Sequence, residues 1–157
     1  MILSKEKIKD LIEIGTIEID PLDLELHLED SSIAIRLSPN LYTYPLELEP
    51  QLSMLDIKNP YLNILEKEYI SESGFVLEPK KFILAESLEY ISIPEYINPF
   101  LDSKFRLDKF GLVLINKGWL GAGFEGFITL CLYNAGQMPI RLFKEEKIAQ
   151  LVLHEVK

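Results

Sequence analysis

The sequence has very few residues of the kinds that bind metal ions most tightly. It contains 1 cysteine and 2 histidines among 157 residues. A single cysteine excludes a disulfide within the chain and a zinc site built from cysteines. The histidines, His27 and His154, are far apart in the sequence and lack metal-ligand spacing, so we interpret both as incidental surface residues. We therefore expect no metal site and no required cofactor.

The sequence also lacks a long apolar run and a surplus of positive charge. No segment approaches the ~20 apolar residues of a membrane span, and the opening MILSKEKIKD has no signal-peptide core. We therefore expect a cytoplasmic protein that does not bind membranes. The formal net charge is −9, which is unfavourable for binding a nucleic acid polymer, because the phosphates require clustered lysine and arginine.

What is present is the composition of one globular domain, residues 1–157, with 48% hydrophobic and 26% charged residues. A short helix is predicted at the N-terminus, where Ser4 suits the N-cap and Gly15 the left-handed stop. Its buried stripe would consist of Ile8, Leu11 and Ile12. The rest of the chain consists of short runs rich in Ile, Leu, Tyr and Phe between Pro, Asn, Gly and Ser, which favours a mostly β sandwich or barrel.

Nine segments are predicted as strands by these runs. Residues 51–70 are predicted as a long loop or a turn of helix, and the sequence does not define the structure of 45–73. The predicted strands are Ile33–Leu37, Leu41–Tyr44, Gly74–Leu77, Lys81–Ala85, Leu88–Ile93, Leu112–Asn116, Gly126–Asn134, Ile140–Phe143 and Ala149–His154.

The strand Gly126–Asn134 carries the only cysteine of the chain. Its alternation places Ile128, Leu130 and Leu132 on one face. The opposite face carries Phe127, Thr129, Cys131 and Tyr133, and is neither plainly core nor plainly solvent. Three interpretations stay open: a subunit interface, the wall of a pocket, or a buried position where Cys131 acts as a small hydrophobe.

Three stretches resemble the dCTP deaminases, which share a superfamily with the trimeric dUTPases. They are FILAESLEYISIP (Phe82–Pro94), GWLGAGFEGFITLCLYNAGQMP (Gly118–Pro139) and IAQLVLHE (Ile148–Glu155). The N-terminal MILSKEKIKDLIEIGTIEIDP is also similar to the first helix and strand of that family. The resemblance implies a dUTPase-like fold, a distorted β-barrel or jelly-roll, that forms a homotrimer with sites between subunits. It places a flexible tail, which closes over nucleotide in relatives, beyond Lys157.

The same resemblance indicates that catalytic positions are substituted. Family deaminases use a glutamate in a pattern like L-E-L-Y-N to activate a water for attack on C4 of cytosine, and here Cys131 takes its place. A thiol with a pKa near 8.5 is mostly protonated at neutral pH and is a poor proton acceptor. Gly121 replaces the aspartate of the family pattern G-W-I-D-P-G-F-E-G, and Ala34 that of S-V-D-L-R-L. Glu125 is an alternative base, although we interpret it as structural.

The phosphate-binding motif of the family aligns with Ser103–Leu112 and has lost both of its serines. Positive charge remains at Lys104, Arg106 and Lys109, which predicts a phosphate site between subunits. The alternative is a solvated strand or turn, with its charge offset by nearby aspartates. We expect Asn116 and Gln150 to border the pocket.

Three functions follow from these observations. The preferred one is a dCTP deaminase or dUTPase homologue with impaired catalysis that binds a pyrimidine deoxynucleoside triphosphate or has a regulatory role, Mg²⁺ being present only with the triphosphate. The second is an active dCTP deaminase or dUTP diphosphatase that uses displaced residues. The third is an oligomeric interaction module without a ligand.

Overall fold

The N-terminal helix forms as predicted. Helix α1 spans Lys5–Glu13, and the Ser4 hydroxyl caps it by accepting a hydrogen bond from the Lys7 backbone N–H at 3.3 Å. Gly15 follows with a φ of 75°, in the left-handed region. The buried side chains of the helix are Ile8, Leu11 and Ile12. The sequence signals for capping and for the apolar stripe therefore predict this element correctly.

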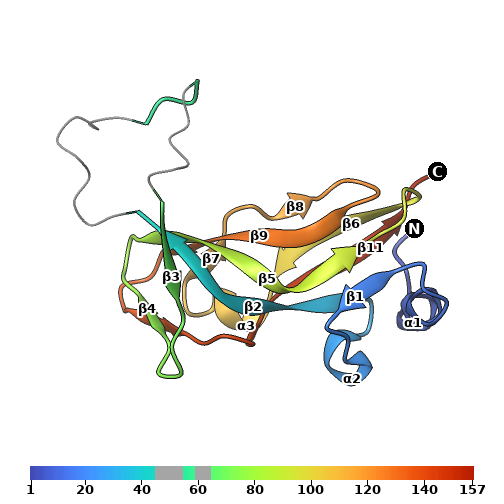
Figure 1. Ribbon diagram of the computed structural model, residues 1–157, viewed down its shortest axis with the longest axis horizontal. Helices are drawn as coiled ribbons and strands as arrows, with labels where there is room; N and C mark the ends of the chain where they lie inside the picture. Colours follow the sequence, from blue (N-terminus) through green and yellow to red (C-terminus); the bar gives the residue numbers. More distant parts are fainter. Residues whose placement is uncertain (45–54, 59–64) are drawn as a thin grey trace.

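The structure, a computed structural model, describes residues 1–44, 55–58 and 65–157 (Figure 1). Strands dominate it, and none of its described helices is long and apolar enough to cross a membrane. After α1 the elements are β1 (Glu18–Asp20), α2 (Leu24–His27), β2 (Ser32–Thr43), β3 (Glu66–Tyr69), β4 (Phe75–Leu77), β5 (Phe82–Ser92), β6 (Ile97–Ser103), α3 (Phe105–Asp108), β7 (Leu112–Leu114), β8 (Gly118–Trp119), β9 (Glu125–Asn134), β10 (Ile140–Leu142) and β11 (Lys147–Glu155).

Nine strands form one antiparallel sheet in the order β7-β9-β5-β2-β11-β6-β8, with β1 paired to β5 and β3 paired to β2. Strands β10 and β4 form a separate two-stranded sheet. The large sheet curls into a half-barrel, with α1, α2 and both termini at one end and β4 at the other (Figure 1). The predicted mostly β fold with a short N-terminal helix is confirmed.

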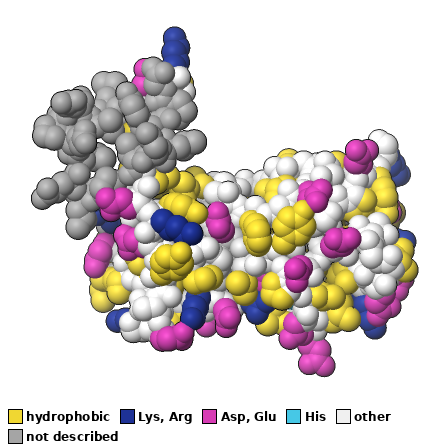
Figure 2. Space-filling view, viewed as in Figure 1, with side chains coloured by type: hydrophobic (Ala, Val, Ile, Leu, Met, Phe, Trp, Pro, Cys, Tyr) yellow, Lys and Arg dark blue, Asp and Glu magenta, His cyan; other side chains and the backbone are white. Residues whose placement is uncertain are grey.

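The inside of the curl contains the hydrophobic core. The alternation predicted for β9 is confirmed, because Ile128, Leu130 and Leu132 are at most 1% exposed. Further core side chains come from β2, β5 and β11, among them Ile33, Ile35, Leu37, Ile83, Ile91 and Leu151. Acidic and hydrophobic side chains are interspersed on the outside, as Figure 2 shows for one face.

Two pairs of predicted strands are in fact single long strands. Residues 33–37 and 41–44 belong largely to β2, and residues 81–85 and 88–93 belong largely to β5. The β2–β5 register shifts between Leu37 and Leu41, and the β5–β9 register shifts between Glu86 and Tyr90. These irregularities bend each strand without ending it. The sequence prediction was wrong here because a bulge and a turn use the same kinds of residue.

The prediction also missed several elements. Strand β6 contains Asn98 and Pro99, residues that are typical of loops, yet it pairs along its length with β11. Helices α2 and α3 have only 4 residues each, too short for a periodic pattern. Of the uncertain segment 45–73, the structure describes β3, the turn at 55–58 and residues 70–73, whereas 45–54 and 59–64 lie outside the described residues.

His27 is buried, so its interpretation as a surface residue was wrong. It is 0% exposed, and its Nε2 lies 3.0 Å from Oε1 of Glu89 on β5. A carboxylate only accepts hydrogen bonds, so Nε2 carries a hydrogen, while Nδ1 lies 2.8 Å from the Asp23 carbonyl oxygen and 3.0 Å from the Asp23 backbone nitrogen. The partner is 62 residues away, and for this reason the sequence does not reveal the pair. His154 is also partly buried, with its ring against that of Trp119 at 4.8 Å.

Glu89 is the centre of this buried network. It is 0% exposed and accepts hydrogen bonds from the Arg36 Nε at 2.6 Å and the Arg36 backbone N–H at 3.0 Å. Burial raises the pKa of Glu89, but the hydrogen bonds from His27 and Arg36 outweigh burial and hold this pKa below its ordinary value of 4.5. The network therefore ties α2 and β2 to β5 through an ionised carboxylate.

Candidate functional site

Cys131 lies in the middle of β9 and points away from the core. Leu84 faces it across β5, and on the other side the Ile115 N–H donates to the Cys131 carbonyl at 2.8 Å. The Asn116 Oδ1 accepts from the Cys131 N–H at 2.9 Å, while its Nδ2 donates to the Thr129 carbonyl at 2.7 Å. The thiol is half-buried, and burial raises its pKa. It therefore stays protonated at neutral pH.

One carboxylate shares this outer face close to the thiol. Glu86 on β5 faces Thr129 on β9, two cross-strand pairs away from the pair of Leu84 and Cys131 and on the same face. It is half-buried and makes no hydrogen bond or ion pair with other described residues. Glu125, the alternative base in the sequence, lies at the far end of β9 and accepts a hydrogen bond from the Tyr90 hydroxyl.

The other two substituted positions lie in different surroundings. Gly121, between β8 and β9, has a φ of 100°, and an added Cβ would meet nothing within 4 Å. The backbone conformation, rather than a lack of space, therefore favours glycine over aspartate there. Ala34 is 0% exposed on β2, opposite Gln150 of β11. Ala34 and Gln150 belong to the side of the sheet that carries Lys104, not to the strands around Cys131.

Lys104 and Gln150 lie close together, and both bind protein groups. The Lys104 ammonium forms an ion pair with Glu29 and lies 3.5 Å from the Gln150 Oε1. Ser32 donates to the same Gln150 oxygen at 3.1 Å, and Lys147 is 3.6 Å from Glu29. Burial raises the pKa of Glu29, but the hydrogen bond and charge of Lys104 lower it more, so the pKa lies below 4.5. Glu29 therefore neutralises Lys104 within the chain.

The other predicted cations are less constrained. The Arg106 guanidinium is exposed, 3.5 Å from Glu146, and the Lys109 ammonium lies 4.9 Å from the centre of the Phe105 ring. Neither contact removes the side chain from solvent, so both remain able to meet an anion.

The two aspartates that the sequence offered as offsetting charges pair with a different lysine. Asp102 and Asp108 lie 3.3 and 3.8 Å from the Lys117 ammonium. Five cations, Lys104, Arg106, Lys109, Lys117 and Lys147, thus share this side of the molecule with four acids, Glu29, Asp102, Asp108 and Glu146. Sequence reasoning missed Glu29, Lys117 and Lys147, because their partners are distant in the chain.

The candidate residues therefore form two groups within one chain. Cys131 and Asn116 lie on the outer face of β9 and β7, whereas Lys104, Arg106, Lys109 and Gln150 surround the end of β6, α3 and β11. No described group of three His, Cys, Asp or Glu side chains could hold a metal ion.

The sequence is similar to enzymes of known activity over nearly its whole length. The model of the dCTP deaminase-like family matches residues 2–156. The dUMP-forming dCTP deaminases of Sulfurihydrogenibium sp. and Persephonella marina are 40% and 42% identical over 97% of this chain and 82% of their own length. That of Aquifex aeolicus is 40% identical over 97% of this chain and 80% of its own.

The fold is similar to those of two solved structures. The 2′-deoxycytidine 5′-triphosphate deaminase from Agrobacterium tumefaciens matches with a TM-score of 0.76 at 18% identity, over 99% of this chain and 48% of that longer one. A point mutant of the Staphylococcus bacteriophage 80alpha dUTPase, with dUpNHpp, matches with a TM-score of 0.55 at 16% identity, over 91% of this chain and 92% of its own. The chain therefore belongs to the dCTP deaminase-like family.

Proposed function

We propose that this protein assembles as a homotrimer that binds a pyrimidine deoxynucleoside triphosphate between subunits without deaminating it. The observation that carries the proposal is the protonated Cys131 thiol at the position of the family's catalytic glutamate. The protonated thiol is a hydrogen-bond donor without a negative charge, and its raised pKa opposes ionisation. Nothing at this position takes a proton from an attacking water, which is the step that a general base provides.

The trimer is supported by the apolar outer face around Cys131. Phe127 and Ile115 are more than half exposed there, and Val113 is 38% exposed. Contiguous exposed apolar groups of this kind mark contact surfaces. A second copy that covers this face would place its own Arg106 and Lys109 against the anion bound near the first copy's Cys131. Any Mg²⁺ would enter with the triphosphate rather than through ligands of the protein.

Glu86 favours a second candidate, an active deaminase with a displaced base. Glu86 and Cys131 are diagonal neighbours on the same face of β5 and β9, and such neighbours are roughly 7–8 Å apart. A water held between Glu86 and the pyrimidine ring would bridge that gap, and Glu86 would then take the proton that the family glutamate takes.

Turnover assays separate these two candidates. We expect the purified protein with Mg²⁺ to produce no dUTP or dUMP from dCTP, and no dUMP from dUTP, above the rate in buffer. We also expect Cys131→Glu alone not to restore deamination, because both serines of the phosphate motif are absent as well. Products separated by ion-exchange chromatography give the measurement.

Two results would contradict this expectation. Turnover by the unchanged protein that disappears in Glu86→Gln would establish the displaced base. Turnover gained by Cys131→Glu would show that the thiol alone blocks the reaction and that the altered phosphate motif is sufficient.

Binding is tested by calorimetry with dCTP, dUTP and dTTP. We expect heat of binding for at least one of them, and a loss of affinity of about tenfold or more in Arg106→Ala, because a hydrogen bond to a charged group is removed. Lys7→Ala, an exposed lysine of α1, is the matched control and should bind as the unchanged protein does.

The assembly is checked on the same samples. Sedimentation should give three times the 18.1 kDa of one chain. A species with the mass of one chain would contradict a site shared between subunits. A trimer that gives no heat of binding with any of the three nucleotides would favour the oligomeric interaction module without a ligand.

A further inference from the structure

One cavity among the described residues has a lining that includes none of the candidate residues. It has a volume of about 700 Å³ at the end of the sheet where β2 and β5 meet β4. This volume lies within the range of small-molecule sites, about 300–1,000 Å³. Neither Cys131 nor any of Lys104, Arg106 and Lys109 lines it. Its chemistry is therefore separate from that of the proposed triphosphate site.

Aromatic side chains form much of the wall. The rings of Tyr44 and Phe82 pack against each other with centroids 5.7 Å apart. Tyr133 faces Phe82 across β5 and β9, and Phe75 of β4 also lines the cavity. All four rings are half-buried, so each keeps surface available to a ligand. Walls of this kind suit a planar aromatic group, which stacks on or packs edge-to-face with such rings.

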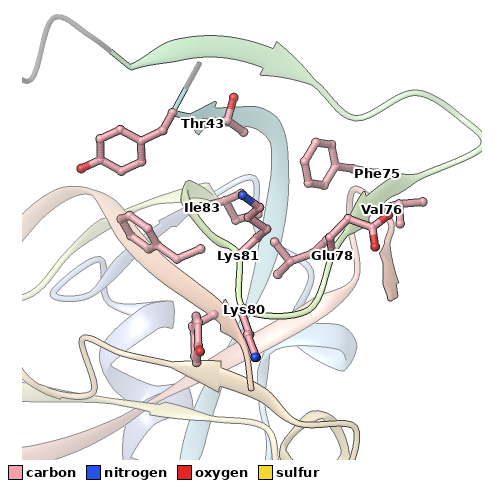
Figure 3. Close-up of a pocket in the computed structure, with 11 residues that line it drawn as sticks. Thr43, Phe75, Val76, Glu78, Lys80, Lys81 and Ile83 are labelled. Atoms are coloured by element: carbon pink, nitrogen blue, oxygen red, sulfur yellow. The ribbon is translucent and has the colours of Figure 1, made fainter. Parts of the chain in front are cut away.

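Two adjacent lysines supply positive charge at the same cavity. Lys80 and Lys81 are both exposed and both line it, and Lys81 reaches into the space between Thr43 and Phe75 (Figure 3). No carboxylate of the described residues forms an ion pair with either lysine, although Glu78 lies on the rim. This contrasts with Lys104, whose charge Glu29 neutralises.

The turn that carries these lysines is held in place by the backbone of β9. Lys80 has a φ of 61°, a backbone conformation that residues other than glycine rarely adopt. The Lys80 N–H donates to the Asn134 carbonyl at 2.9 Å, and the Asn134 N–H donates to the Lys81 carbonyl at 3.0 Å. Two backbone hydrogen bonds with one residue of the sheet thus fix the backbone of the turn that carries both lysines.

We propose that this cavity binds a phosphorylated aromatic molecule of the nucleoside monophosphate class, with the ring against Tyr44, Phe82 and Phe75 and the phosphate at Lys81. All of the residues that line this cavity come from one chain, and Cys131 is not among them, although Tyr133 lies on the same face of β9 as Cys131.

Calorimetry with AMP tests the proposal, because AMP is a purine nucleotide and not a ligand of the proposed pyrimidine site. We expect AMP to bind, and Lys81→Ala to weaken it by about tenfold to a hundredfold. Tyr133→Ala should weaken AMP by about fivefold or more through lost ring contact. Lys7→Ala on α1 and Arg106→Ala should leave AMP affinity unchanged. Inorganic phosphate and adenosine should each bind more weakly than AMP.

Each contrary result has a definite meaning. No binding of AMP would overturn the proposal, and so would an equal loss in Lys7→Ala, which would indicate attraction by net charge alone. If adenosine binds as tightly as AMP, the lysine charge does not contribute to binding. If inorganic phosphate binds as tightly as AMP, the aromatic rings do not contribute. Loss of AMP binding in Arg106→Ala would assign the nucleotide to the other site instead.

Discussion

Glu89→Gln is expected to lower the free energy of unfolding by about 3–5 kcal/mol, which is the cost of removing one partner from a buried ion pair. Glu89 is fully buried and accepts three hydrogen bonds, one from His27 and two from Arg36. A glutamine of the same size keeps one oxygen, but its NH₂ group would face hydrogen-bond donors of His27 or Arg36. It also leaves the Arg36 guanidinium, which is 14% exposed, without its counter-charge. Urea unfolding at pH 7 measures the effect.

Glu86→Gln is the matched control. It makes the same chemical change on the same strand, but at a half-buried position without a hydrogen bond to other described residues. We expect a change within about 0.5 kcal/mol. A similar loss in both variants would mean that the buried network contributes nothing specific.

The stability difference between the unchanged protein and Glu89→Gln should also depend on pH. The folded pKa of Glu89 is lowered below 4.5, so its contribution is present above that value and is lost as the pH falls through the folded pKa. The difference should therefore be constant from pH 7 to about pH 5 and narrow below about pH 4.5. A constant difference down to pH 3 would contradict an ionised Glu89.

Asn134→Ala is expected to cost about 2–4 kcal/mol, because it leaves three backbone groups without partners. The side chain is 0% exposed and donates to the Leu77 carbonyl at 2.9 Å and the Met138 carbonyl at 2.8 Å, while it accepts from the Gly136 N–H at 2.9 Å. It therefore joins the end of β9 to β4 and to the turn before β10. Chemical denaturation measures the loss.

Asn116→Ala is the control for this change, because its side chain also makes two hydrogen bonds with the sheet. These bonds are on the exposed side, where water replaces the lost amide, so we expect a cost of about 1 kcal/mol. A cost in Asn134→Ala no larger than in Asn116→Ala would show that the buried carbonyls find other partners.

The sequence predicts the parts of the fold that depend on near neighbours. The cap at Ser4, the stripe of α1 and the alternation of β9 all follow from residues within a few positions of one another. Strand β6 could not be predicted, because its pairing with β11 overrides the loop preference of Asn98 and Pro99.

The candidate site is predictable only to the same extent. The outward position of Cys131 follows from its alternation with Leu130 and Leu132. The neutralisation of Lys104 by Glu29 joins residues 75 apart, and the pairing of Asp102 with Lys117 depends on the fold of α3. Local sequence shows that cations are present, but not which of them already have a partner.

Strand β2 has a consequence for how the molecule unfolds. It pairs with β11 along its first half and with β3 along its second, while β5 runs beside it on both sides of the bulge. Strand β2 is thus the link between the half of the sheet with β5, β9 and β7 and the half with β11, β6 and β8, so we expect the two halves to unfold together. The protein should therefore melt in one cooperative step, with the amides of β2 among the last to exchange with solvent.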